Sequence, residues 1–251
     1  MTDAAAAPVI RLSHVTKTFG EHVVLDDLSF EVPRGRAFCL LGRSGTGKSV
    51  TLRHLVGLVK PDRGSVLVEG LDVPQLPRRE LNALRRRIGF LFQNSALFDS
   101  ISVGENVAFP LRRHTKLNDR EVRERARARL AEVGLEVEYD KMPAALSGGM
   151  RKRAALARAM ALDPAVLLVD EPSAGLDPIT SLEIDQLLLE RKAESGVTMV
   201  VVTHNIPSAR IVGDELGLLD RGRLVARGTA PDLEASDLEI VRDFMRSTGG
   251  G

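Results

Sequence analysis

The sequence predicts an α/β protein built on a mostly parallel sheet. Short apolar runs recur at residues 9–12, 37–41, 66–69, 88–92, 166–169 and 199–203. Several of these runs are apolar at every position, as in strands that are covered on both faces. Segments with helical patterning lie between them, at residues 48–57, 120–133, 148–161 and 179–194. Strands that alternate with helices are typical of a parallel sheet with helical crossover connections.

The stretch from about 94 to 146 interrupts this alternation. It has helical patterning but no convincing strand, so we expect an inserted α-helical subdomain. A C-terminal tail, about 230–251, contains one short helical region at residues 237–245. The length of 251 residues suits one large domain. We therefore expect a single domain over 1–251 that carries the insertion and the tail.

Composition excludes several classes of protein. The net charge of +1 gives no reason to expect a nucleic-acid partner. No run reaches the roughly 18 consecutive apolar residues of a membrane span, and residues 1–8 lack the pattern of a secretory leader. The single cysteine, Cys39, forms no internal disulfide and, in an apolar run, is expected to be a buried core thiol. We expect a cytoplasmic chain that reaches a membrane only through a partner.

Residues 42–49 match the eight-residue phosphate-binding loop. Its candidate nucleotide contacts are Gly42, Arg43, Ser44, Gly45, Thr46, Gly47, Lys48 and Ser49. The glycines let backbone N–H groups surround the β- and γ-phosphates. Lys48 supplies positive charge, and the Ser49 hydroxyl can coordinate Mg²⁺. A glycine-rich turn with a chance lysine is the alternative, which the strand before the loop and the helix after it disfavour.

Two acidic residues follow the apolar run 166–169. Asp170 would lie at the carboxyl end of a strand, where ligands bind in open α/β sheets, and would hold Mg²⁺ directly or through water. We expect Glu171 to point elsewhere, because side chains alternate along a strand, and to polarise the attacking water. Both acids could instead cap a helix, but their combination with the phosphate loop indicates a P-loop NTPase.

Residues 146–150 read Leu-Ser-Gly-Gly-Met. Ser147 can cap the helix that follows, and Gly148 and Gly149 leave backbone N–H groups uncovered at its start, which makes a second phosphate-binding surface. An ordinary capped helix is the alternative. In this string the sequence resembles the ATP-binding subunits of ABC transporters, whose signature is typically LSGGQ. The resemblance implies a homodimer that sandwiches two ATP molecules, with this surface serving the ATP of the opposite protomer.

Four further positions match motifs of this family in their expected order. Gln93 matches the Q-loop glutamine that contacts Mg²⁺ and the attacking water, and His204 matches the switch histidine that contacts the γ-phosphate. Asp177 ends the D-loop match, residues 174–177, which would cross the dimer interface. Phe19 matches the position that stacks on adenine, although tyrosine is commoner there. Singly these signals are weak, because a lone His is more often structural and a lone Phe more often lies in a core.

The resemblance covers residues from about 10 to 228 and implies an active ATPase whose cofactors are ATP and Mg²⁺. The presence of Gln93, Ser147, Glu171 and His204 supports an intact site. Glu171, His204 and Gln93 would be catalytic, and Ser49, Gln93 and Asp170 would form the metal set. The family fold adds an antiparallel β subdomain to the P-loop NTPase core.

A finer resemblance is to the MlaF-like ATPases of Mla/Mce-type phospholipid transport systems. It rests on residues 91–98, 105–112, 146–150, 153–159 and 177–180. A signature that ends in methionine and runs into Arg-Ala-Ala-Leu-Ala-Arg-Ala is more specific than the general motifs. Because Ser147 and the backbone donors remain, we expect function to survive Met150. The family implies an integral-membrane, MlaE-like permease contacted through about 94–111, an Mce-domain protein in the same complex, and a place on the cytoplasmic face of the inner membrane.

Several alternatives stay open at this stage. The apolar residues within 94–111 could receive a permease helix or could only pack the helical subdomain. The eight basic residues within 112–129 could face anionic lipid, but we favour a solvated helix face. An importer ATPase for a small solute is a further possibility, since the ATPase never touches the cargo. A soluble scaffold-type ABC ATPase would lack a permease, and a P-loop kinase or GTPase is disfavoured by the signature string.

Overall fold

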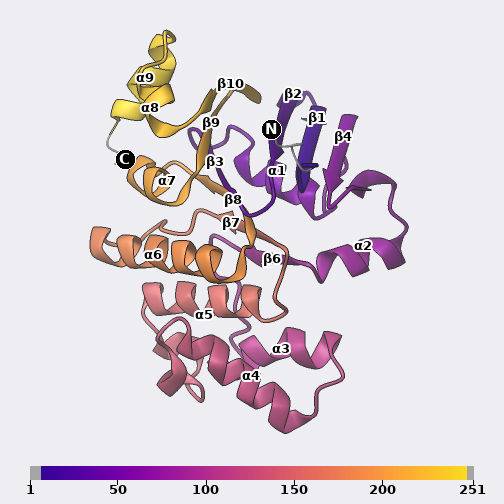
Figure 1. Cartoon of the computed structure of the whole chain (residues 1–251), viewed down its shortest axis with the longest axis vertical. Coiled ribbons are helices and arrows are strands. Elements are labelled where there is room, and N and C mark those ends of the chain that lie inside the picture. The colour runs from indigo at the N-terminus through magenta and orange to yellow at the C-terminus, as the bar shows by residue number, and fades with distance from the viewer. Residues whose placement is uncertain (1–6, 248–251) are drawn as a thin grey trace, which may run out of the picture.

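In the computed structural model, which describes residues 7–247, a six-stranded sheet forms the centre of the molecule (Figure 1). The strand order is β10-β9-β3-β8-β7-β6. Five strands run parallel: β3 (Ala37–Leu41), β6 (Ile88–Leu91), β7 (Val166–Asp170), β8 (Thr198–Thr203) and β9 (Glu215–Asp220). Only the edge strand β10 (Arg223–Gly228) is antiparallel to its neighbour. The predicted mostly parallel α/β core is confirmed.

A second, antiparallel sheet lies beside β3 and α1 (Lys48–Leu55), at the upper right of Figure 1. Its order is β2-β1-β4-β5. The strands are β1 (Ile10–Phe19), β2 (His22–Val32), β4 (Arg63–Val68) and β5 (Leu71–Asp72). This sheet is the antiparallel β subdomain that the family resemblance implied. The short apolar runs 9–12 and 66–69 marked only parts of β1 and β4, because their other ends carry polar residues on exposed faces.

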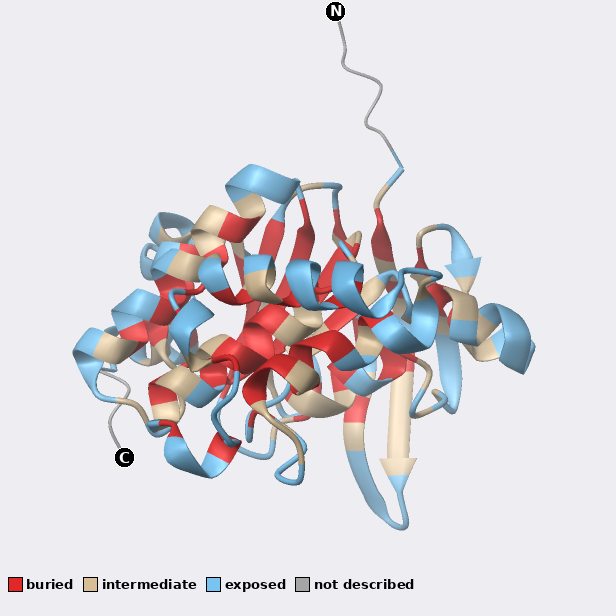
Figure 2. Cartoon of the chain, turned by 90° about the horizontal axis from the view of Figure 1, so that it is seen from below, coloured by how far each residue is buried: buried red, intermediate tan, exposed pale blue. Residues whose placement is uncertain are grey.

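Side chains from the two faces of the six-stranded sheet belong to two separate cores. Cys39 and Leu41 of β3 join one core with α5 (Gly148–Met160), α6 (Pro178–Ser195) and α7 (Ile206–Val212). Phe38 and Leu40 of the same strand join the other core, with α1 and the antiparallel sheet. Strands β3, β7 and β8 are therefore buried along their whole length. Buried residues, red in Figure 2, gather in the interior of the molecule. Cover on both faces explains why these strands are apolar at every position.

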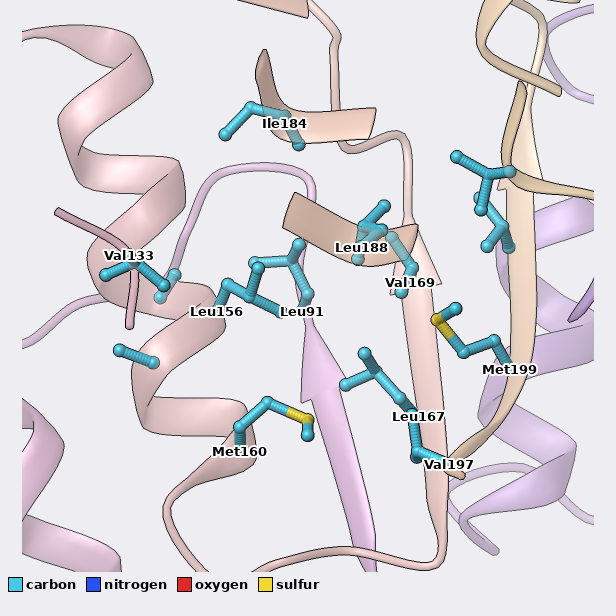
Figure 3. Close-up of a cluster of buried hydrophobic side chains, with 14 of the residues drawn as sticks. Leu91, Val133, Leu156, Met160, Leu167, Val169, Ile184, Leu188, Val197 and Met199 are labelled. Atoms are coloured by element: carbon cyan, nitrogen blue, oxygen red, sulfur yellow. The ribbon is translucent and has the colours of Figure 1, made fainter. Parts of the chain in front are cut away.

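Helix α5 packs directly on the central sheet. Its residues Leu156 and Met160 lie beside Leu91 of β6 and Leu167 of β7, and Ile184 of α6 closes the cluster (Figure 3). All five side chains are buried. The helix that begins at the signature string is thus fixed to the strands whose ends carry the acidic residues.

No strand forms between β6 and β7, where the described residues 92–165 are helical or irregular. This segment contains α3 (Val103–His114), α4 (Asp119–Ala131), two 3-10 turns (Glu136–Glu138 and Pro143–Ala145) and α5. Helices α3 and α4 lie at the bottom of Figure 1, beyond α5. The predicted helical insertion is confirmed as part of the fold.

The remaining helices connect or follow these layers. A 3-10 turn (Val73–Gln75) and α2 (Arg78–Arg85) lead from the antiparallel sheet to β6, and α8 (Ala230–Glu234) and α9 (Glu239–Arg246) follow β10. Among residues 7–247 no helix is both long enough and apolar enough to cross a membrane. Residues 1–6, which bear on the expected absence of a leader, and the last four residues of the tail lie outside the described part of the chain.

Candidate functional site

The phosphate loop joins the end of β3 to the start of α1, as predicted. The Nζ atom of Lys48, the first residue of α1, donates hydrogen bonds to the carbonyl oxygens of Gly42 (2.8 Å) and Arg43 (3.0 Å). The Lys48 side chain is only 6% exposed. A buried ammonium needs such partners, and here the loop backbone supplies them. The charge of Lys48 is therefore held at the loop.

Two glycines show why the loop suits a phosphate. Gly47 has φ 104°, and a Cβ there would lie 2.8 Å from the carbonyl oxygen of Val24, so any other residue would push α1 away from β2. Gly45 has φ 82°, and a Cβ there would meet no atom within 4 Å. The backbone at the loop tip is thus open to a ligand. The first turn of α1 contains no acidic side chain that would neutralise the positive end of the helix dipole, so this end can bind a phosphate.

Ser49 and Asp170 place two oxygen ligands side by side. The Ser49 hydroxyl donates a hydrogen bond to Oδ1 of Asp170 at 2.9 Å. Asp170 is the last residue of β7 and is buried. Burial raises the pKa of the Asp170 carboxyl, while the hydrogen bond from Ser49 opposes that shift. A hydroxyl and a carboxylate are ligands that suit Mg²⁺, so this pair fits the predicted metal.

Glu171 lies just beyond the end of β7. Its backbone has φ 47°, so the alternation of strand side chains, from which its direction was predicted, does not extend to it. Its Oε1 atom lies 3.5 Å from Nζ of Lys48. Its Oε2 atom lies 3.0 Å from Nδ1 of His204 and also accepts a hydrogen bond from the His204 backbone N–H at 3.3 Å. One buried carboxylate therefore connects the phosphate loop to the residue after β8.

Three neighbouring strands bring these groups together. The order β3-β8-β7 within the sheet puts the carboxyl ends of the strands before Lys48, His204 and Asp170 side by side. Ligands bind at such ends in open α/β sheets. Lys48, Ser49, Asp170, Glu171 and His204, which lie far apart in the sequence, thus form one cluster of direct contacts.

Gln93 and Phe19 stand outside that cluster. Gln93 is exposed, two residues beyond the end of β6, and its carbonyl accepts a hydrogen bond from Lys152. Phe19 ends β1 with 48% of its surface exposed, and Nζ of Lys17 lies 5.2 Å from its ring centroid. Phe19 is therefore not a core residue, which was the alternative to a position that stacks on adenine.

The signature string begins α5 as predicted. The Ser147 hydroxyl caps this helix by accepting a hydrogen bond from the Met150 backbone N–H at 3.2 Å, and Ser147 is exposed. A Cβ on Gly149 would lie 2.4 Å from Cγ2 of Thr180. Gly149 thus has a packing role, because it permits the close approach of α5 and α6. Gly148 is partly exposed beside Ser147.

Asp177, in the D-loop match, is the N-cap of α6. Its Oδ1 atom accepts hydrogen bonds from the backbone N–H groups of Ile179 and Thr180, both at 3.0 Å. These bonds and the Thr180 hydroxyl lower the pKa of the Asp177 carboxyl. The structure therefore gives Asp177 a local role within its own chain, and its expected contact across a dimer remains a prediction.

Lys152 is a site residue that sequence reasoning missed. It is 5% exposed, and its Nζ atom donates hydrogen bonds to the carbonyl oxygens of Glu171 (3.1 Å) and Gln93. Burial lowers the pKa of Lys152, while the charges of Asp170 and Glu171 oppose that shift. Helical spacing could have shown that Lys152 faces the core, because it precedes the core residue Leu156 by one turn, but it could not have shown what Lys152 contacts.

A polar network lies behind the cluster. Asp185 of α6 is buried, and its Oδ1 atom has no hydrogen-bond partner among the described residues. Oγ of Ser208, in α7, lies 3.4 Å from Oγ of Ser173. Asn205, the residue after His204, donates from Nδ2 to Oγ of Ser173 at 3.3 Å. Burial raises the pKa of the Asp185 carboxyl to about 6. The contacts of Ser173 with Asn205 and Ser208 join the turn after Glu171 to the start of α7.

The basic residues of α4 are largely paired with acids of the same chain. Arg125 and Arg129 both contact Asp163, and Arg123 and Arg127 both lie near Asp140, at 3.6 and 3.7 Å. Paired arginines have little charge left for a lipid surface. This arrangement favours the interpretation of a solvated helix face.

The fold and the clustered side chains define a P-loop NTPase, with a phosphate loop, a hydroxyl–carboxylate pair and a second acid at the ends of parallel strands. The sequence model of the family described as ABC transporter matches residues 25–174. The chain belongs to the ABC transporter family, as an ABC ATPase domain.

Individual relatives agree with this assignment. The chain is 38% identical over 249 residues to the intermembrane phospholipid transport system ATP-binding protein MlaF of Escherichia coli K12, an alignment that covers 99% of this chain and 93% of that protein. It is 44% identical over 236 residues to the probable ribonucleotide transport ATP-binding protein mkl of Mycobacterium tuberculosis. That alignment covers 94% of this chain but only 66% of the mycobacterial protein.

Solved structures share the fold. A dimeric ATP-binding cassette in a post-hydrolysis state, bound to ADP and phosphate, superimposes with a TM-score of 0.81 at 35% identity, covering 88% of this chain and 98% of the other. CbiO1 of Clostridium perfringens, part of an ABC transporter complex, superimposes with a TM-score of 0.83 at 30% identity, covering 95% and 94%.

Proposed function

We propose that this chain binds ATP with Mg²⁺ and hydrolyses it as the ATPase subunit of a lipid transporter. The contact of one Glu171 carboxylate with both Lys48 (3.5 Å) and His204 (3.0 Å) carries the ATPase part of the proposal. This contact sets an acid, a phosphate-binding lysine and a histidine at one point. Such a group is suited to phosphoryl transfer, where catalysis consists mainly of positioning and electrostatic stabilisation.

Each residue of the cluster has a definite task in this reaction. Lys48 and the N–H groups of residues 42–47 bind the β- and γ-phosphates, and Phe19 stacks on the adenine. Glu171 accepts a hydrogen bond from the attacking water and so orients it toward the γ-phosphate. His204 holds the Glu171 carboxylate and contacts the γ-phosphate. Ser49, Asp170 and Gln93 would hold Mg²⁺, which when bound neutralises charge on the phosphate oxygens.

The site is completed by a second copy of the chain in this proposal. Ser147, Gly148, Gly149 and Asp177 would face the ATP of the opposite protomer, forming a homodimer around two ATP molecules. The exposed Ser147 hydroxyl accepts from the Met150 N–H and keeps its own O–H to donate, which suits a phosphate from outside the chain at the start of α5. The structural relative with ADP and phosphate is itself dimeric.

A groove near the helical insertion supports a permease partner. Phe92, Phe98 and Phe109 are 39%, 45% and 48% exposed and line a groove of about 770 Å³. The rings of Phe98 and Phe109 lie 5.0 Å apart between centroids. A solvent-facing aromatic groove of this kind suits the apolar face of a helix. We assign residues 94–111, together with Phe92, to contact with a cytoplasmic helix of an MlaE-like permease on the inner face of the membrane.

Phospholipid is the cargo that the relatives favour. The alignment with MlaF covers 93% of that protein's length, whereas the alignment with the mycobacterial protein, whose name gives ribonucleotide transport, covers 66%. A permease and an Mce-domain protein would complete the complex. A small-solute importer remains the competing function, since cargo chemistry lies in the partners.

Two measurements test this proposal. The purified chain should release phosphate from ATP only when Mg²⁺ is present, and failure to do so would contradict the ATPase assignment. Affinity purification from the native organism should recover an integral-membrane permease and an Mce-domain protein. Recovery of a permease with a small-solute binding protein would instead favour the importer, and recovery of no membrane protein would favour a scaffold-type ATPase.

A further inference from the structure

The ammonium group of Lys152 lies where three parts of the molecule meet. Lys152 belongs to α5, the helix that begins at the signature string. Its Nζ atom donates to the carbonyl oxygen of Glu171, just after β7, and to that of Gln93, in the loop after β6. The Lys152 side chain thus binds the backbone of two residues that have roles in the proposed reaction, Glu171 with the attacking water and Gln93 with Mg²⁺.

The backbone of Glu171 needs external support. Its φ of 47° lies in a region that residues with side chains rarely adopt, and such conformations persist only when the surroundings fix them. Three contacts do so here, one of which is the hydrogen bond that the Ala174 N–H donates to the Glu171 carbonyl at 3.3 Å. The Glu171 N–H donates to the carbonyl oxygen of Val202 at 2.9 Å, and its carbonyl accepts from Lys152 at 3.1 Å. These bonds hold the peptide from both sides and so aim the carboxylate at Lys48 and His204.

Helix α5 also binds the loop beneath the aromatic groove, residues 93–96, at a second place. The Arg158 guanidinium donates to the carbonyl oxygens of Ser95 (2.9 Å) and Ala96 (2.7 Å). Arg158 and Ala96 line the groove. The segment 93–96 is therefore bound to α5 through Arg158 at one end and Lys152 at the other. A displacement of this segment must move Lys152 or break its bond.

We propose that Lys152 is a positioning residue that ties the backbone of Gln93 to that of Glu171, so that movement of the loop beneath the groove changes the aim of the Glu171 carboxylate. This inference rests on the proposed role of Glu171 in ATP hydrolysis. It gives a physical contact through which an occupant of the groove can alter the rate of hydrolysis without touching the nucleotide.

The first test separates positioning from binding. Lys152→Met removes both hydrogen bonds, and because an ångström of misplacement costs on the order of 10²-fold in rate, kcat should fall by that order while the dissociation constant for ATP stays unchanged. Lys152→Arg should restore most of kcat, because a guanidinium can donate to both carbonyls. If Lys152→Met fails to fold, Lys152→Ala, which also lacks a donor, replaces it. Normal kcat in the folded variant overturns the proposal.

Lys192→Met provides the matched control. Lys192 is also a largely buried lysine, but its Nζ bonds Asp214, away from the cluster. This variant should lower the melting temperature while leaving kcat of the folded protein unchanged. Glu171→Gln, measured in parallel, distinguishes the two hypotheses. Normal turnover of Glu171→Gln would contradict the proposed function. If Glu171→Gln loses turnover while Lys152→Met keeps a normal kcat, only the inference about Lys152 is contradicted.

The second test addresses transmission from the loop. Arg158→Met releases the carbonyls of Ser95 and Ala96 and should lower kcat in the parent protein. In a Lys152→Met background the same change should have little further effect, because the connection to Glu171 is already cut. If the two reductions in kcat multiply, Arg158 and Lys152 act independently, and the proposed coupling of the loop to Glu171 through Lys152 is wrong.

Discussion

The Nδ1 atom of His204 lies 3.0 Å from Oε2 of Glu171, and this contact joins the ends of two neighbouring parallel strands. Glu171 is buried, whereas about half of the His204 side chain is exposed. The Glu171 carboxylate thus contacts the buried Lys48 through one oxygen and the half-exposed His204 through the other. That asymmetry puts the histidine, and not the acid, on the solvent-facing side of the contact.

Replacing Glu171 with Gln should stop turnover and spare binding. The amide keeps the size of the side chain but is a poor acceptor for the proton of the attacking water, so phosphate release should fall by about 10²- to 10⁴-fold. ATP should still bind and should trap a closed dimer. Phosphate release and size-exclusion chromatography with ATP measure the two effects, and normal turnover would remove Glu171 as the catalytic base.

Replacing Lys48 with Ala should weaken ATP binding. The Lys48 ammonium is bound by the loop carbonyls of Gly42 and Arg43, and its removal takes away the charge that the phosphates would meet. Affinity should fall by at least ~10-fold, the amount expected for one lost charge-assisted hydrogen bond. Titration calorimetry measures it, with Lys192→Met as the control for the loss of a lysine. An unchanged affinity would contradict the phosphate-loop assignment.

Replacing Ser147 with Arg tests the two-chain site. Ser147 is exposed and caps α5, so a large cation there should obstruct the approach of a second protomer while leaving the phosphate loop of its own chain intact. ATP binding to the monomer should persist and ATP-driven dimerisation should be lost. Light scattering with Glu171→Gln as the parent background measures dimerisation. A Ser147→Arg protein that still dimerises counts against the sandwich.

Asp185 gives the protein a pH-dependent stability. Burial raises the pKa of its carboxyl to about 6, from an ordinary value of 3.8, so the folded state holds the proton more tightly than the unfolded chain does. Stability from this group is complete below the ordinary pKa and is lost as pH rises through about 6. The loss at neutral pH is about 3 kcal/mol, from about 1.4 kcal/mol for each pH unit.

Replacing Asp185 with Asn should therefore stabilise the protein at neutral pH. The free energy of unfolding in urea should rise at about pH 7.5 and change little at about pH 3, below the ordinary pKa of 3.8, where the parent carboxyl is largely protonated in both states. Asp62→Asn is the control of opposite sign, because the hydrogen bond from Lys17 lowers the pKa of Asp62. A gain for Asp185→Asn that is equal at both pH values would exclude ionisation as its cause.

Local patterns predicted the parts of the fold that they encode directly. The apolar runs of β3, β7 and β8 are complete because both faces are buried, and the phosphate loop and the signature string are contiguous. Strand β2 was not foreseen, because its partly exposed face mixes His22, Asp26 and Asp27 with apolar residues. Its place depends on pairing with β1, which no local pattern shows.

The residues of the site could be predicted from the sequence, but the contacts between them could not. Lys48, Asp170, Glu171 and His204 were each found from motifs, whereas the direction of Glu171 depends on a backbone angle that the sequence does not reveal. Lys152 was missed because its role consists of contacts to backbone carbonyls. Such contacts leave no motif, since any residue can provide a carbonyl.

The buried Asn106 has a consequence for how this protein can diverge. Its side-chain amide is bonded to the backbone N–H and carbonyl of Phe98 and to the carbonyls of Ile101 and Ser102. The backbone of residues 98–102 is therefore bound by one amide on α3, and of the loop's own side chains the Ser102 hydroxyl also takes part, because it caps α3. After a gene duplication, the other side chains of the loop can therefore change without a change in its backbone, so long as Asn106 and Ser102 are inherited.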